Sequence, residues 1–299
     1  MVYTDRLANR LAALADSSGL SYRRKQKVRK YLLYLLVVLT CGIFMFPMYW
    51  MLVASIQPYD AIIQNPTWFP LDVVGQMSLD VYVQVFVNRN FGRWYLNSII
   101  VAIIAIAVTT ATATLAGYGL TRIQFRGRKT FARLILFSYM FPPILLAFPQ
   151  YQIWRQVGWL NTYHGIGIAH IALSLPFSMW MMWKFFQTVP IAYEESAWMN
   201  GASRFHSFKD VAIPMAKPGM VAVAIFTFAV SWNDFTMATI LLPNSQMQTL
   251  PPAVQTFVEQ NTVYWGQIMA ASTMMSIPPF LLVYKLQESI LEGFRTGGL

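Results

Sequence analysis

The sequence predicts an all-α membrane protein with six transmembrane helices. Hydrophobic residues make up 56% of its 299 residues and charged residues only 11%, which is too apolar for an ordinary soluble domain. Several apolar runs are long enough for a helix to cross a hydrocarbon core about 30 Å thick. The single cysteine, Cys41, lies in one of these runs, so neither a disulfide framework nor a cysteine metal site is available.

The apolar runs follow one another along the chain with polar segments between them. The second run is rich in Ala, Thr and Gly, whose small side chains let membrane helices approach closely. The third contains Pro142, Pro143 and Pro149, so we expect it to be kinked or locally broken. The predicted spans are 31–55, 96–120, 134–150, 165–186, 220–242 and 266–286.

The polar segments complete the expected organisation. Segments 57–93 and 243–265 are predicted to be outer loops, and no soluble domain or low-complexity segment interrupts the chain. The expected parts are therefore a tail over 1–30, one six-helix domain over 31–287 and a second tail over 288–299.

The distribution of Lys and Arg predicts the orientation in the membrane. With the N-terminus inside, 19 of the 22 basic residues fall on inner segments, and the outer segments hold only Arg89, Arg93 and Arg155. Short cytoplasmic segments carry the excess of Lys and Arg, so both termini are expected in the cytoplasm. The net charge of +10 does not indicate nucleic acid, because the basic residues cluster beside apolar runs and form no recognition motif.

A polar segment, 190–219, separates the fourth and fifth spans. Gly201 allows a sharp turn within it, and Pro214 and Pro218 are expected to fix where the next helix begins. A short amphipathic helix placed here, outside the membrane, suits docking into a partner's groove, although an amphipathic loop lying on lipid is the alternative. The residues predicted to share its face, at spacings of three and four, are Ile191, Glu195, Trp198, Ala202 and Phe205.

This segment resembles the coupling loop of ABC-importer permeases. The family pattern is Glu-Ala-Ala, three residues, Gly, nine residues, then Ile-x-Leu-Pro. Every spacing is preserved here, with Ser196, Val211 and Ile213 departing from the family's residue types. The matching positions are Glu195, Ser196, Ala197, Gly201, Val211, Ile213 and Pro214.

The resemblance implies a role for each part of the loop. In the family the motif's Glu and Gly lie on a helix set in a cleft of the ATPase subunit. Carried over, Glu195 is the polar contact, Gly201 the turn and Ala197 a close-packing position. From the periodicity we add that Trp198 and Phe205 fill the groove.

No phosphate-binding loop for ATP is present in the sequence. Such a loop needs Gly, four residues, then Gly-Lys-Ser/Thr, whereas the nearest stretch reads Gly127-Arg128-Lys129-Thr130 and has Arg122 where the first Gly would stand. We expect ATP and Mg²⁺ to bind a separate subunit and this chain to bind no cofactor. No metal-ligand spacing and no nucleophile–base pair indicates catalysis, so the chain is not expected to be an enzyme.

Ionisable and aromatic residues inside the spans mark a candidate solute path. Trp232, Asn233 and Asp234 resemble the Trp-Asn-Glu/Asp signature of sugar-importer permeases, and Trp232 could stack on a sugar ring while the other two bond hydroxyls. A structural network between helices is the alternative for Asp234, and His170 is expected to be a satisfied interhelical residue. Aromatic residues expected along the path, with lipid or helix packing as their alternative, include Tyr139, Phe141 and Trp180.

Resemblance over nearly the whole chain from residue 31 narrows the class. The FPMYWMLVAS, GASRFHSF and SWNDF stretches are similar to the second permease of maltose, glycerol-3-phosphate and polyol importers, whereas the tail GFRTGGL departs from the usual ending. The resemblance implies a type I ABC-importer permease in a bacterial or archaeal cytoplasmic (inner) membrane. Its partners would be a second permease chain, an ATPase dimer, an external solute-binding protein, membrane lipid and a carbohydrate or polyol.

Two alternatives remain open from the sequence. The same architecture could carry another solute, such as an amino acid or phosphate. A self-contained secondary transporter or membrane enzyme would need its own coupling or catalytic residues at membrane depth, where the spans offer little besides Asp234 and His170.

Overall fold

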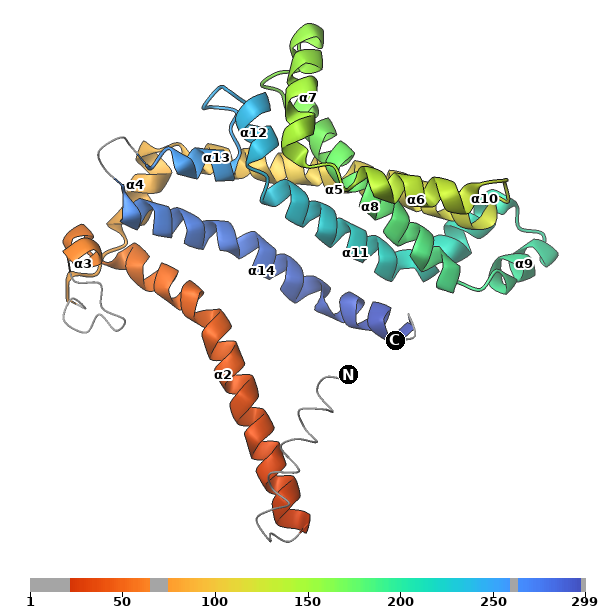
Figure 1. Cartoon of the computed structure of the whole chain (residues 1–299), viewed down its shortest axis with the longest axis horizontal. Helices are drawn as coiled ribbons and strands as arrows, with labels where there is room; N and C mark the ends of the chain where they lie inside the picture. The colour runs from red at the N-terminus through yellow and green to blue at the C-terminus, as the bar shows by residue number, and fades with distance from the viewer. Residues whose placement is uncertain (1–21, 65–74, 259–262, 297–299) are drawn as a thin grey trace. The chain divides into compact units, whose positions relative to one another are not determined.

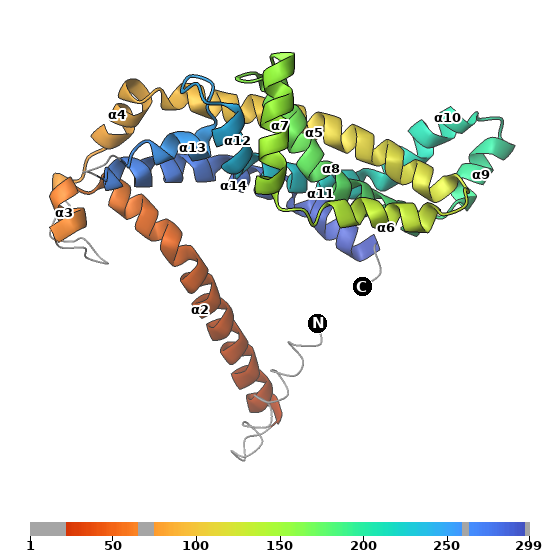
Figure 2. The ribbon, with the colours of Figure 1, turned by 45° about the horizontal axis from the view of Figure 1, so that its top comes forward.

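The structure is a computed structural model that describes residues 22–64, 75–258 and 263–296. These parts of the chain are almost entirely helical, and the extended pairing found in them is an isolated bridge between Val258 and Val263. The chain separates into two units, residues 1–78 and 79–299, which are described one at a time. Figures 1 and 2 show the helices of each unit.

The first unit contains the first predicted span. Helix α2, Tyr22–Ile56, includes the whole predicted span 31–55 and begins within the segment predicted to be the N-terminal tail, 1–30. Its membrane-length window has no buried side chains within the chain, and residues such as Ile43 and Phe44 are exposed. A helix that is apolar all round is suited to lipid or to packing against other membrane helices. The short helix α3, Tyr59–Gln64, follows it.

The second unit holds the remaining spans. By length and composition, five helices of the described chain can cross a membrane, and α6 with α7 adds a sixth if the bent pair is one span. The helices of this unit are α4 Asp80–Asn88, α5 Phe91–Arg122, α6 Arg128–Ser138, α7 Pro143–Val157, α8 Tyr163–Thr188, α9 Ala192–Met199, α10 Arg204–Ser207, a π-helical turn Phe208–Ala212, α11 Ile213–Trp232, α12 Thr236–Leu241, α13 Leu250–Gln255 and α14 Trp265–Thr296.

The third span is broken, as its prolines predict. Helices α6 and α7 meet at an angle of 88°, which Figure 1 shows as α7 leaving the direction of α6. The break lies at Tyr139–Pro142, and Pro143 occupies the first turn of α7, where its missing N–H costs no intrahelical hydrogen bond. Proline therefore ends one helix and starts the next.

Three predictions about the elements are wrong. Segment 57–93 is not a continuous loop, because it contains α3, α4 and the start of α5, and segment 243–265 contains α13. The fifth span does not run from 220 to 242 without interruption, because α11 ends at Trp232 and α12 restarts at Thr236. Short helices in polar segments and a break without proline both lack a strong hydropathy pattern, so the sequence does not show them.

Helices α5, α8 and α11 form the packed centre of the second unit and lie side by side in both ribbon views (Figures 1 and 2). Their contacts depend on small residues. A Cβ at Gly117 of α5 would lie 2.7 Å from Met182 Cβ of α8, and one at Gly219 of α11 would lie 2.5 Å from the Phe185 ring of α8. The contact at Gly117 is the close approach that the small-residue content of the second span predicts.

The first turns of α5 hold the segment that precedes α13. The Trp94 indole N–H donates to the Ser245 carbonyl at 2.8 Å, and the Asn97 amide donates to the Gln246 and Gln248 carbonyls at 3.0 and 2.9 Å. The Leu250 N–H donates to the Ser98 hydroxyl at 2.8 Å. This end of α5 is thus joined to residues about 150 positions later by four hydrogen bonds.

Candidate functional site

The polar segment 190–219 forms two short helices joined by a turn, followed by the π-helical turn and the start of α11. Helix α9 ends at Met199, and Gly201 follows with φ of +89°, in the left-handed region that favours glycine. The Ser203 side chain then accepts from the His206 N–H and starts α10. Gly201 is therefore the turn that its position in the motif implies.

The predicted single helical face is wrong. Because α9 stops at Met199, Ala202 and Phe205 lie beyond the turn and do not continue the face of Glu195 and Trp198. Residues at spacings of three and four share a face only within one continuous helix. The positive φ at Gly201 interrupts the helix, so the spacing does not place these residues on one face.

The start of the following helix also differs from the prediction. Helical structure runs without interruption from Arg204 to Trp232, so Pro214 and Pro218 lie inside it. A widened turn absorbs the first proline: residues Phe208–Ala212 are π-helical, and the Ile213 N–H donates to the Phe208 carbonyl five residues earlier. Such a turn relieves the clash between a proline ring and the preceding turn.

The motif residues differ in how much they are exposed. Glu195, Ser196, Gly201 and Pro214 are exposed, whereas Ala197 and Trp198 are half-buried. The Arg204 guanidinium lies 5.6 Å from the centre of the Trp198 ring, and this contact joins α9 to α10 across the turn.

Two large apolar side chains protrude at the turn. Phe205 is 68% exposed, and Met199, which the sequence reasoning missed, is 89% exposed. An apolar residue two positions before a glycine, in an otherwise polar segment, is the signal that could have identified Met199. The exposed side chains of the loop thus include both the polar Glu195 and these two apolar residues.

The sequence reasoning also missed Glu194, which is fully buried. Arg122 Nε donates to Glu194 Oε1 at 2.7 Å, and the Tyr118 hydroxyl donates to Glu194 Oε2 at 2.7 Å. Arg122 also donates to the Val189 carbonyl at 2.9 Å. Tyr118, Arg122 and Glu194 are hereafter called the Glu194 cluster.

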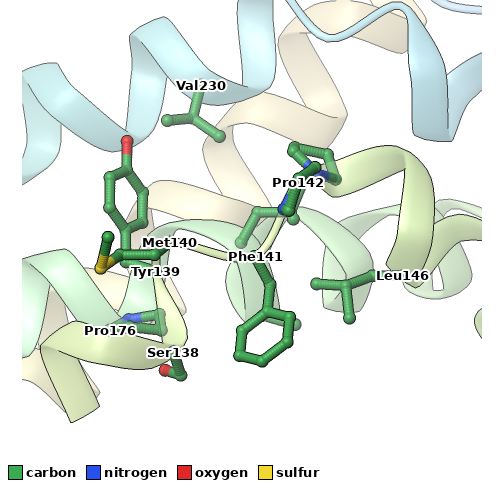
Figure 3. A pocket seen from close by; sticks show the side chains of 11 residues that line it. Ser138, Tyr139, Met140, Phe141, Pro142, Leu146, Pro176 and Val230 are labelled. Carbon is green, nitrogen blue, oxygen red and sulfur yellow. The ribbon is translucent and has the colours of Figure 1, made fainter. Parts of the chain in front are cut away.

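Two of the predicted solute-path residues line a pocket at the break between α6 and α7 (Figure 3). The pocket has a volume of about 310 Å³, and Tyr139 and Phe141 stand on its wall with their rings pointing away from each other. Its lining is mainly apolar: Ser138, Tyr139, Met140, Phe141, Pro142, Pro143, Leu146, Ala172, Leu173, Pro176 and Val230.

Trp180 does not line this pocket but is joined to it through aromatic contacts. The Phe177 ring lies 5.4 Å from the Tyr139 ring and 5.8 Å from the Trp180 ring. The ring of Phe226 of α11 contacts both Phe177 and Tyr139, with ring centres 4.7 Å and 6.0 Å apart. These rings pack α6, α8 and α11 together beside the pocket.

Trp232 has no free face for a sugar ring in this structure, which corrects the stacking role considered above. Its side chain is 2% exposed, stacked on Phe228 with ring centres 5.2 Å apart and covered by the edge of Tyr95. The indole N–H donates to the Met275 carbonyl of α14 at 3.2 Å. Trp232 thus joins α5, α11 and α14 in the core.

Asp234 and His170 form the interhelical network that was the alternative to a ligand role. Asp234 accepts from the Met237 and Ala238 N–H groups at 3.3 and 2.9 Å, at the start of α12. His170 of α8 lies 3.1 Å from Asp234 Oδ2 through Nε2 and 2.8 Å from Ser231 Oγ through Nδ1. Asn233, between them in sequence, is exposed and donates to the Ala229 carbonyl of its own helix.

Comparisons with known proteins agree on one class of membrane protein. A family model described as "Binding-protein-dependent transport system inner membrane component" matches residues 110–295. The trehalose/maltose transport system permease protein MalG of Thermococcus litoralis is 29% identical over 280 residues, covering 92% of this chain and 99% of that protein. The inner membrane ABC transporter permease protein YcjP of Escherichia coli is 30% identical over 257 residues, covering 85% of this chain and 90% of that protein.

The fold also matches a solved structure. A chain in the crystal structure of a bacterial ABC transporter involved in the import of the acidic polysaccharide alginate superposes with a TM-score of 0.73. The match covers 90% of this chain and 98% of that chain at 22% sequence identity, so it is a likeness of fold.

Proposed function

This chain belongs to the family of binding-protein-dependent transport system inner membrane components, and we propose that it is the transmembrane permease subunit of an ATP-driven importer of a carbohydrate or polyol. The observation that carries the proposal is the loop 190–219, which preserves the motif spacing of importer permeases and exposes Glu195 and Phe205 between two membrane-length helices. The names of relatives such as the trehalose/maltose permease support a sugar as the solute.

The proposed assembly divides the work among several subunits. A second, related permease chain would complete the membrane channel, two ATPase subunits would hold ATP and Mg²⁺, and an external binding protein would deliver the solute. The role of this chain is to receive movement at residues 190–219 in the cytoplasm and to change the arrangement of its helices. Solute then gains access from one side of the membrane and afterwards from the other.

Within the loop, the exposed residues are proposed to contact the ATPase. Glu195 would give the polar contact, and Phe205 and Met199 would enter the apolar groove. Gly201 would form the turn between α9, which carries Glu195 and Met199, and α10, which carries Phe205. Trp198, Ala197 and Ser196 would complete the surface of α9, while Pro214 sits in the helix that transmits the movement. An exposed glutamate and two apolar side chains on adjoining short helices suit a partner's groove better than they suit lipid.

For the solute path, we assign the pocket at the α6–α7 break. Tyr139 and Phe141 offer aromatic surface to a sugar ring, and Trp180 supports them from α8 through Phe177. Asn233 is exposed, and its amide oxygen could accept from a hydroxyl group of the solute. Its neighbours Trp232 and Asp234 are instead assigned a structural role, because Trp232 is buried and Asp234 contacts His170 of α8.

The test is transport by the complex. The tagged chain is purified from gently solubilised native membranes, its partners are identified, and the assembly is reconstituted in vesicles with its binding protein. We expect recovery of an ATPase with an intact phosphate-binding loop and a second permease, and solute uptake that requires ATP. Recovery of this chain alone, active without ATP, would overturn the proposal.

Two substitutions then test the loop. Glu195→Ala and Gly201→Asp are expected to reduce uptake while leaving membrane insertion unchanged, because one removes the exposed polar contact and the other forces a side chain into a left-handed backbone. Asp210→Asn is the matched control, since Asp210 is an exposed carboxylate in the same segment but outside the motif. Normal uptake in both motif variants would remove the coupling assignment.

A further inference from the structure

The Glu194 cluster joins the short helix α9 to the last turn of α5. Tyr118 and Arg122 are four residues apart, so both side chains leave α5 on the same face and reach the two oxygens of one carboxylate. Each contact is 2.7 Å long, within the range of charge-assisted hydrogen bonds. The carboxylate is therefore held at two points and cannot rotate without losing a partner.

Burial makes this geometry difficult to replace. The Glu194 side chain is 0% exposed, so water does not reach the carboxylate, whereas the Arg122 side chain is 13% exposed. A buried carboxylate without partners is strongly unfavourable, and the helix that carries it is consequently restricted to positions where both contacts persist. The cluster fixes the position of α9 more narrowly than apolar packing would.

Other helices meet at the same point. Arg122 also donates to the Val189 carbonyl at the end of α8, and the Tyr118 ring packs 5.6 Å from Phe186 of α8 and 4.5 Å from Phe208 of the π-helical turn. The segments before and after α9 are thus both attached to the last turns of α5. The end of α8, helix α9 and the π-helical turn before α11 therefore all contact the last turns of α5.

The cluster also sets which way Glu195 points. Consecutive residues of an α-helix are separated by about 100° around its axis. With Glu194 turned inward to Arg122, its neighbour Glu195 is turned outward and is exposed. The buried glutamate thereby orients the motif glutamate.

We propose that Glu194, Arg122 and Tyr118 are positioning residues, which make α9 move as one body with α5 and α8 and so convert movement of the loop into movement of the membrane helices. This inference rests on the proposed function for its transport consequence. The rigid attachment itself does not depend on the identity of the solute or the ATPase.

The first experiment measures the attachment in the full-length chain. Spin labels are placed at Met199→Cys on α9 and Leu115→Cys on α5, both exposed positions, in a Cys41→Ser background that removes the native thiol. We expect a narrow distance distribution that is lost in Glu194→Gln and kept in Glu195→Gln, the adjacent exposed glutamate. An unchanged distribution in Glu194→Gln would overturn the proposal.

The second experiment measures coupling in the reconstituted complex. Glu194→Gln is expected to lower solute uptake per ATP hydrolysed by about fivefold or more, the size of a typical coupling free energy, while ATP hydrolysis continues. Tyr118→Phe, which keeps the ion pair and loses one hydrogen bond, should have a smaller effect in the same direction. A variant that only destabilised the fold would lower uptake and hydrolysis together.

The outcomes separate the two ideas. If the wild-type complex takes up no solute with ATP, the proposed function fails, and the distance measurement still decides whether the cluster fixes α9. If the wild type transports and Glu194→Gln has the same yield per ATP, the positioning role alone fails. Should Glu194→Gln not fold, Tyr118→Phe and Arg122→Lys give the same measurements with smaller changes, and a wild-type result in both would reject the proposal.

Discussion

At Gly117 the backbone of α5 touches α8 with no space for a side chain. A Cβ there would lie 2.7 Å from Met182 Cβ and 2.8 Å from the backbone of Met182 and Trp183. Two residues later, a Cβ at Gly119 would meet only Ile123 Cδ1, at 3.9 Å. The two glycines therefore share a helix but not a structural role.

This contrast predicts opposite effects for the same substitution. Gly117→Ala should destabilise the chain by about 1–3 kcal/mol, because the helices must separate to admit a methyl group. Gly119→Ala should be neutral or stabilising by roughly 0.5–1 kcal/mol, since alanine restricts the unfolded chain. Thermal unfolding of both purified variants checks this, and equal melting temperatures would show that α5 and α8 are not in close contact at Gly117.

The two adjacent glutamates show what the sequence can predict at this scale. The motif spacing identifies Glu195, and the structure shows it exposed. Nothing local distinguishes Glu194, because its partners Tyr118 and Arg122 are 76 and 72 positions away. A buried ion pair formed across such a separation follows from tertiary packing, which a single sequence does not contain.

At the scale of elements, the break between α11 and α12 is held by polar contacts. Asp234 accepts two N–H groups at the start of α12 and contacts His170 of α8. The first N–H groups of any helix lack intrahelical partners, and in a membrane no water can replace Asp234. The carboxylate thus allows a helix to restart within an apolar segment.

We expect Asp234→Ala to lower stability by about 1–3 kcal/mol, the usual cost of leaving buried donors unsatisfied. Asn233→Ala is the matched control, because Asn233 is exposed and its side chain donates to the Ala229 carbonyl at the end of the same helix. Unfolding of both variants in detergent gives the comparison. A larger loss for Asn233→Ala would contradict the role given to Asp234.

The two broken spans explain why one break was predicted and the other was not. Pro142 and Pro143 predict the first break, because proline has no backbone N–H to continue the hydrogen bonding of a helix. The second falls at Asn233–Phe235, which contains neither proline nor glycine. Hydropathy identifies the long apolar runs well. It does not show that a carboxylate within such a run accepts the first N–H groups of a new helix.

At the scale of the whole molecule, the orientation in the membrane remains a prediction from charge. We expect a thiol at Met199→Cys, in a Cys41→Ser chain, to be protected from an impermeant reagent added to intact cells. A thiol at Ser245→Cys should react, because its segment precedes α13 on the side that carries few basic residues. Permeabilised cells should label both positions, and the reverse pattern in intact cells would invert the topology.

Helix α5 connects features at two distant places. Its first turns hold Ser245, Gln246 and Gln248 by their carbonyls, and its last residue, Arg122, holds Glu194. It has 32 residues and, at 1.5 Å per residue, is about 48 Å long. A helix is stiff along its axis because each turn is hydrogen-bonded to the next. Helix α5 is therefore a rigid connection between these two sets of hydrogen bonds. We therefore expect a displacement of Glu194 to reach the segment 245–248 directly along the axis of α5.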